Sequence, residues 1–177
     1  MRTTKNVSFS MMATQVGDLM LEKKGDDEIA FTQQFSGVID SSTVGELLGD
    51  DDAMAALTQL CFDDLGELRD IGLGAFPIKA VFYDQLIKIT VSRKKADLQG
   101  SLQAFRLSPL AGTPLGLEDG AQFRCQFKMK AEAEDKQLQL MKAAMLRGDC
   151  KLEISPAPGF TDSQTEIPAA GDDEEFE

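Results

Sequence analysis

The sequence predicts an α+β fold: one domain over residues 1–155, with a mostly antiparallel sheet packed by two helices, and an acidic tail over residues 156–177. Several segments alternate apolar and polar residues, which is typical of strands with one buried face. Short turns join these segments, so neighbouring strands are expected to run antiparallel. From Pro156 onward Pro, Gly, Ser, Thr and acidic residues dominate, a composition typical of disorder. An OB-like, partly open barrel is compatible with this order of elements.

The N-terminal half begins with two predicted strands, residues 7–22 and 27–40, which the Gly-containing hairpin turn KKGDD joins. In the second strand Ile29, Phe31 and Phe35 occupy one parity, and the polar residues between them occupy the other. Because side chains alternate across a strand, this pattern predicts one buried face and one face in water.

A helix is predicted over residues 40–62. Asp40 or one of the two serines after it can cap the first turn, where a side-chain oxygen meets unpaired backbone N–H groups. Gly49 would divide this helix, and the run Asp50–Asp52 would then cap a second segment. Residues 63–78, with their glycines and Pro77, are expected to be a linker or loop.

The C-terminal half is predicted to return to strands. The expected segments are a strand over 79–92, a polar turn over 93–100, a strand over 101–107, a loop over 108–120, a strand over 122–130, a helix over 132–148 and a strand over 149–155. The strand over 122–130 alternates most regularly, with Phe123, Cys125, Phe127 and Met129 on one parity. Gly148 stands where a helix C-cap glycine is expected.

No catalytic or cofactor signature is present in the sequence. The chain has no histidine, which excludes Ser-His-Asp and Cys-His catalysis and histidine-containing metal sites. Asp50–Asp52 with Asp63 and Asp64 lack the spacing of a calcium loop, and helix capping is the interpretation we favour. We therefore expect a non-enzymatic protein without a cofactor or a metal.

The three cysteines are widely spaced and include no CxxC pair, which indicates core residues or reduced thiols rather than disulfides or zinc ligands. No apolar run approaches the ~20 residues of a membrane-spanning helix. The N-terminal residues lack the continuous apolar segment of a signal peptide. We expect a cytoplasmic location.

Charge is distributed in three blocks: residues 1–78 carry a net charge of −9, residues 79–151 of +5 and residues 152–177 of −8. Phosphate backbones bind several cations on one face by counterion release, and single-strand binders usually add stacking aromatic rings. Lysine and arginine also decorate any solvated sheet face, which is the structural alternative. The candidate nucleic-acid-binding residues are Lys88, Arg93, Lys94, Lys95, Arg124, Lys128 and Lys130, with Tyr83 and Phe105 as stacking rings.

The chain ends in GDDEEFE, and the candidate partner-binding residues are Asp172, Asp173, Glu174, Glu175 and Phe176. This ending resembles the acidic, phenylalanine-containing tails of bacterial and phage single-stranded DNA-binding proteins. Those tails end on the phenylalanine, whereas this chain adds Glu177. The resemblance implies docking into replication or repair proteins, and competition of the tail with DNA for the binding groove. The segment FSGVIDSSTVGELLG, followed later by IGLGAFPI, gives the layout a resemblance to small uncharacterised phage proteins, which implies a phage or prophage origin and no activity.

The sequence thus favours an accessory protein of phage or bacterial DNA metabolism that binds single-stranded nucleic acid, with a tail for partner recruitment and autoinhibition. An alternative is an acidic inhibitor or DNA mimic that binds a host DNA-binding or defence protein through the N-terminal half. A structural or assembly module that forms a homo-oligomer is a third interpretation. Salt dependence of DNA binding, with and without the tail, distinguishes these classes.

Overall fold

The computed structural model describes residues 7–26, 29–64, 67–69, 75–110 and 122–158. The elements are β1 (Phe9–Val16), β2 (Met20–Lys23), β3 (Ile29–Asp40), α1 (Ser41–Leu48), α2 (Asp51–Cys61), β4 (Phe76–Ile78), β5 (Phe82–Val91), β6 (Lys94–Pro109), β7 (Gln122–Ala133), α3 (Asp135–Arg147) and β8 (Cys150–Pro156). Of the predicted tail over residues 156–177, Pro156 belongs to β8 and Ala157 is buried, and residues 159–177 lie outside the described residues.

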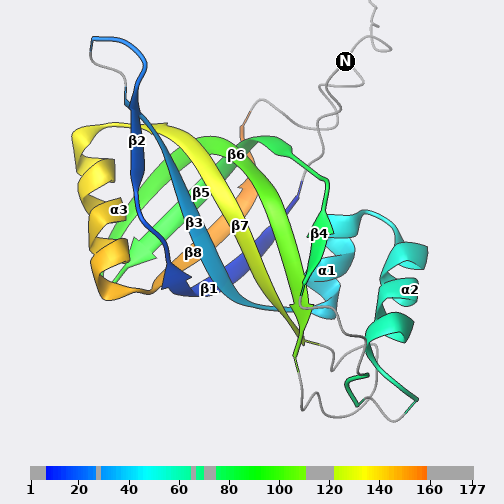
Figure 1. The fold of residues 1–177 in the computed structure, drawn as a ribbon. Helices are drawn as coiled ribbons and strands as arrows, with labels where there is room; N and C mark the ends of the chain where they lie inside the picture. The colour runs from blue at the N-terminus through cyan, green and yellow to red at the C-terminus, as the bar shows by residue number, and fades with distance from the viewer. Residues whose placement is uncertain (1–6, 27–28, 65–66, 70–74, 111–121, 159–177) are drawn as a thin grey trace, which may run out of the picture.

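The sheet is a closed barrel (Figure 1). Strands β1, β8, β5, β6, β7 and β3 are neighbours in that order, and β1 pairs again with β3 to close the ring. Each of these pairings is antiparallel, as the short predicted turns implied. The short strands β2 and β4 are additions that pair with β3 and β6. The α+β class and the barrel-like sheet are therefore confirmed.

Phenylalanine rings fill the barrel interior. Phe105 stacks on Phe127 with ring centroids 5.2 Å apart, and Phe82 meets Phe105 edge to face at 5.5 Å. Phe35 and Phe9 pack on Phe127 at 5.9 and 6.2 Å. Offset and edge-to-face aromatic pairs of this kind contribute about 0.5–1.5 kcal/mol each beyond the area that they bury. This cluster joins strands from both halves of the chain into one core.

The helices lie at the two ends of the barrel (Figure 1). Helix α3 covers one end, where the Gln137 side-chain amide donates to the backbone oxygen of Asp97 on β6 at 2.8 Å. The apolar side of α3 buries Leu138 and Met141, and the helix ends at Gly148 in the left-handed conformation, as predicted. Helices α1 and α2 lie at the opposite end.

The predicted helix over residues 40–62 is two helices, so the described residues contain three helices rather than two. Gly49 adopts φ 67° and ends α1, because glycine enters the left-handed region without a Cβ clash. Asp40 caps α1 by accepting from the Thr43 N–H, and Asp50 caps α2 by accepting from the Asp52 N–H, both at 2.9 Å. Capping thus accounts for these two aspartates, as we favoured.

The predicted strand over residues 7–22 is two strands, β1 and β2, with an interruption between them. Both pair with β3, the predicted hairpin partner. The Gly17 N–H donates to the Gln34 backbone oxygen at 2.8 Å, and the Gln33 side-chain amide donates to the Gly17 backbone oxygen at 3.0 Å. These bonds hold the chain beside β3 through the interruption. The first residues of β1 pair with β8 instead, which closes the barrel.

The predicted polar turn over residues 93–100 is wrong in extent. The turn is confined to Ser92 and Arg93, and Lys94 already pairs with Val91 in the ladder between β5 and β6. Residues 94–100 have a mostly polar sequence because most side chains in this part of β6 are exposed to solvent, and Leu98 is its buried apolar residue. Among the described residues no helix is long and apolar enough to cross a membrane.

Candidate nucleic-acid interface

Three predicted cations lie on the outer face of β7. Phe123, Cys125, Phe127 and Met129 point into the core, so Arg124, Lys128 and Lys130 point outward and are exposed. Their cross-strand partners on both sides are uncharged: Ser101 and Thr32 for Lys130, Gln103 and Gln34 for Lys128, and Ser108 and Val38 for Arg124. The three cations therefore face solvent without a carboxylate directly opposite on either neighbouring strand.

Arg106 on β6 joins this group. It is exposed, and its cross-strand partners are Gln126 on β7 and Pro77 on β4. We call Arg106, Arg124, Lys128 and Lys130 the basic row. Arg106 was not among the predicted site residues. The sequence does contain a signal for its orientation, because the buried apolar residues of β6 change from even to odd positions between Leu102 and Phe105. That change marks the bulge at Ala104, φ 57°, which turns Arg106 outward.

The remaining predicted cations do not join the basic row. Lys88 on β5 lies between Asp97 on β6 and Glu153 on β8, so carboxylates flank it on both sides. Arg93, Lys94 and Lys95 are exposed at the hairpin between β5 and β6. Lys95 is six residues from Ser101, the partner of Lys130, which corresponds to about 20 Å along the strand. The structure therefore does not bring Lys88, Arg93, Lys94 and Lys95 together with the basic row.

The two predicted stacking residues have different positions. Phe105 is 1% exposed and packs between Phe82 and Phe127 in the core, so it presents no ring to a ligand. Its prediction as a surface ring is wrong, because the bulge at Ala104 places it on the inward face. Tyr83 points outward, as predicted from its neighbour Phe82, which is buried.

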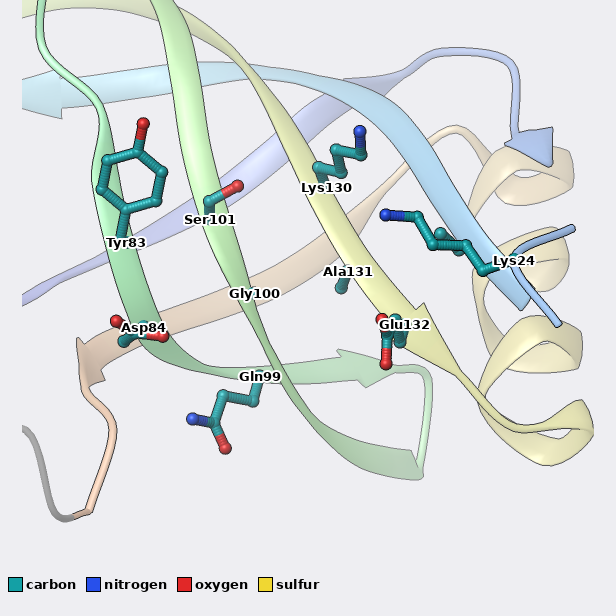
Figure 2. A pocket seen from close by; sticks show the side chains of 10 residues that line it. Lys24, Tyr83, Asp84, Gln99, Gly100, Ser101, Lys130, Ala131 and Glu132 are labelled. Atoms are coloured by element: carbon teal, nitrogen blue, oxygen red, sulfur yellow. The ribbon is translucent and has the colours of Figure 1, made fainter. Parts of the chain in front are cut away.

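Tyr83 lines a depression on the outer face of the barrel, with a volume of about 480 Å³ (Figure 2). We call this depression the Tyr83 pocket. Figure 2 shows the Tyr83 ring on one side and the amino groups of Lys24 and Lys130 on the other, with Ser101 between them. The other residues that line it are Ala30, Asp84, Gln99, Gly100, Ala131 and Glu132.

Two backbone features shape this pocket. Asp84 has φ 55°, and the register between β5 and β6 shifts between Phe82 and Gln85, which moves Tyr83 out of the regular ladder. Gly100 lies where β6 crosses close to β7: a Cβ there would be 2.4 Å from the Lys130 backbone oxygen and 2.7 Å from the Ala131 Cβ. A glycine is therefore required at the floor of the pocket.

The charges around the Tyr83 pocket are mixed. The Lys130 amino group lies 4.0 Å from a Glu22 carboxylate oxygen, and both side chains are largely exposed. Such a surface pair contributes about 0–1 kcal/mol and is screened by salt, so it leaves Lys130 available to a ligand. The sequence alone does not indicate Lys24, Gln99 and Ser101 as site residues, because only the tertiary structure brings them close to Tyr83.

The cysteines and aspartates offer no second site within the described residues. Burial raises the pKa of the Cys61 thiol to about 11 and those of Cys125 and Cys150 to about 12, so these thiols stay protonated and unreactive near neutral pH. The Asp63 carboxylate accepts a hydrogen bond from the Glu67 N–H at 2.9 Å. No group of three or more potential metal ligands occurs in the part of the chain that the structure describes.

The predicted partner-binding residues, Asp172–Phe176, lie outside the described residues. The described chain ends at Pro158, and the Ala157 N–H donates to the Asp84 backbone oxygen at 2.9 Å. Asp84 lines the Tyr83 pocket, so Ala157 lies beside a residue of this pocket. No family model, curated protein or solved structure matches the chain.

Proposed function

We propose that the protein binds single-stranded nucleic acid along the basic row and catalyses no reaction on it. The observation that carries the proposal is the strand pairing of the row: four outward cations on two paired strands have uncharged residues directly opposite, in a chain of net charge −12, and Lys130 at the end of the row also lies 4.0 Å from the Glu22 carboxylate. Around Lys88, by contrast, acids occupy the paired positions on both neighbouring strands. Phosphates that bind the row would release counterions, which makes binding salt-dependent.

A single strand fits this surface better than a duplex. Single-strand binders combine a line of cations with aromatic rings on which bases stack. The outer face of the barrel offers both, since Lys130 belongs to the basic row and also lines the Tyr83 pocket. The polar side chains between the cations, such as Gln103 and Gln126, suit hydrogen bonds to sugar and phosphate groups.

The acidic tail is proposed to regulate this surface and to recruit a replication, repair or host-defence protein in the cytoplasm. Residues 159–177 contain seven acidic and no basic side chains. The described residues that precede them include Ala157, whose N–H donates to the backbone oxygen of the pocket residue Asp84, and we infer that the tail acts on the surface from this attachment point. At low salt such a tethered anion competes with a bound strand.

A second candidate is a docking surface for a basic protein, the chemistry of an acidic inhibitor or DNA mimic. Exposed acids gather on and after α1 and α2. These acids are Glu46, Asp50, Asp52, Asp64 and Glu67, whereas Arg69 is the one basic residue in the sequence between residues 40 and 69. A protein with this function does not bind DNA, and its affinity for a basic partner protein falls as the salt concentration rises.

The test of the proposed function is fluorescence anisotropy of a labelled single-stranded oligonucleotide of about 30 nucleotides, at about 50 mM and about 200 mM salt. The double variant Arg124→Gln/Lys128→Gln removes two cations of the row. The control Lys88→Gln/Lys94→Gln removes the same charge elsewhere on the barrel. Because each phosphate contact contributes about 0.7 to the slope of log K against log salt, the row variant should reduce that slope by about 1.4.

The control variant should leave the slope close to that of the unmodified protein. Equal losses in both variants would mean that general electrostatics, and not the basic row, carries binding. An absence of binding at the lower salt, by the full chain and by a chain ending at Pro158, would overturn the proposal and favour the protein-docking function.

A further inference from the structure

We propose that the Tyr83 pocket holds one nucleotide of the bound strand, with its base on the Tyr83 ring and its phosphate between Lys24 and Lys130. This inference rests on the proposed function, which it makes specific. The basic row alone binds phosphates at any position of a strand. The pocket adds a site that is lined by a ring, a hydroxyl and two amino groups (Figure 2).

The two sides of the pocket suit the two chemical parts of a nucleotide. Tyr83 comes from β5 and supplies a flat aromatic surface, on which any base can stack. Lys24 follows β2 and Lys130 lies on β7, and Figure 2 shows their amino groups on the side away from Tyr83. Lysine ammonium groups bind phosphate oxygens as point charges. A nucleotide that spans the pocket therefore meets stacking at one end and two lysines at the other, where its phosphate would compete with the Glu22 carboxylate that lies 4.0 Å from Lys130.

The residues at the floor and lower rim of the Tyr83 pocket indicate which groups of a nucleotide it can bind. Ser101 lies between the two sides, and Gln99 with Asp84 and Glu132 completes the rim. An amide and two carboxylates accept hydrogen bonds from the N–H groups of a base edge or from a sugar hydroxyl. The same carboxylates repel additional phosphates, since they offset the two lysines. The pocket thus favours a nucleotide with a single phosphate over a free triphosphate.

The size of the pocket agrees with this ligand. Its volume of about 480 Å³ lies in the range of about 300–1,000 Å³ that is usual for small-molecule sites. The pocket is also continuous with the basic row, because Lys130 belongs to both. A strand that follows Arg124, Lys128 and Lys130 along β7 therefore enters the pocket at the end of its path.

The test uses the fluorescence of the protein itself. Tyr83 is the single tyrosine of the chain, which has no tryptophan, so tyrosine emission reports the pocket alone. Stacking of a base on the ring should quench this emission. The oligonucleotide of the anisotropy experiment is titrated into the full chain, and both signals are followed. Free tyrosine amide in a parallel titration corrects for light absorbed by the DNA.

We expect quenching and anisotropy to saturate together. Binding by anisotropy without quenching would overturn the pocket assignment and leave the basic row intact. An absence of any anisotropy change would reject the proposed function itself. The free ligand classes are compared in the same assay: a nucleoside monophosphate should quench at a lower concentration than the matching triphosphate, and the reverse order would contradict the pocket assignment.

Two variant pairs localise the effect. Tyr83→Leu should bind the oligonucleotide about 5- to 150-fold more weakly than Tyr83→Phe, which keeps the ring; this is the range of one lost stacked base. Lys24→Gln should weaken binding and reduce quenching, while Lys23→Gln removes the neighbouring exposed lysine, which does not line the pocket. Equal behaviour within either pair would contradict the inference. Circular dichroism of each variant verifies that it is folded.

Discussion

Gly37 on β3 lies against Met12 on β1 where the barrel closes: a Cβ at Gly37 would be 2.4 Å from the Met12 backbone oxygen and 2.9 Å from the Met11 side chain. Real Cβ atoms do not approach backbone oxygen this closely, so the contact requires glycine. The pair between β1 and β3 is short and irregular, with a register shift after Ala13. Closure of the barrel thus depends on one residue without a side chain.

Gly37→Ala should therefore destabilise the protein. We expect the free energy of unfolding in urea to fall by about 1–3 kcal/mol, the range for overpacking a buried position. Gly45→Ala is the matched control, since a Cβ at Gly45 in α1 meets nothing within 4 Å. It should be neutral or stabilise by up to about 1 kcal/mol, because alanine favours helix. Similar losses in both variants would contradict the close approach at Gly37.

Phe105→Leu tests the core position of a ring that the sequence placed on the surface. The variant loses its contacts with Phe82 and Phe127, so the free energy of unfolding should fall by about 1–3 kcal/mol. Oligonucleotide affinity of the folded protein should not change. A loss of affinity at unchanged thermal stability would show instead that the Phe105 ring reaches the ligand.

The buried thiols predict how stability depends on alkaline pH. Burial raises the pKa of Cys125 from its ordinary value of 9.0 to about 12, so the folded state keeps a proton that the unfolded chain loses. Stability is therefore fully present below pH 9.0 and falls as the pH rises toward about 12. The slope is about 1.4 kcal/mol per pH unit for each such thiol.

The measurement is urea unfolding at several pH values between about 9 and 10.5, for the unmodified chain and for Cys125→Ala. The variant should be less stable at neutral pH, because it leaves a small cavity, but its stability should fall less steeply with pH. Groups other than Cys125 titrate alike in both proteins, so the difference in slope isolates this thiol. Parallel curves would show that Cys125 ionises in the folded state.

A chain ending at Pro158 should bind the oligonucleotide more tightly than the full chain at low salt, and the difference should shrink as salt rises. The chain is cut after Pro158 because a cut closer to β8 would remove Ala157, which is 1% exposed and whose N–H donates to the Asp84 backbone oxygen. Replacing Asp172, Asp173, Glu174 and Glu175 by their amides should mimic the truncation. Phe176→Ala should not, because competition for the basic row is electrostatic. If Phe176→Ala alone released the surface, the aromatic ring would be the competitor.

Local pattern was enough to predict most of the elements. The alternation in residues 122–130 identified β7 and its inward face, and Gly148 and Asp40 marked helix ends, because caps and strand faces depend on residues a few positions apart. The same alternation placed Arg124, Lys128 and Lys130 outward. Residues 93–100 were misread, since a strand with few buried residues carries little alternation to detect.

The sequence by itself therefore determined the class of the fold, the antiparallel order expected from short turns, and which face of β7 meets solvent. Tertiary structure alone decided that the sheet closes, that Phe105 lies inside, and that Lys88 is paired with acids on both neighbouring strands while Lys130 is paired with Thr32 and Ser101. It also decided that Lys24, Tyr83, Ser101 and Lys130 share one pocket. The physical reason is that pairing register and bulges join residues far apart in the chain, and a shift of one residue exchanges the two faces of a strand.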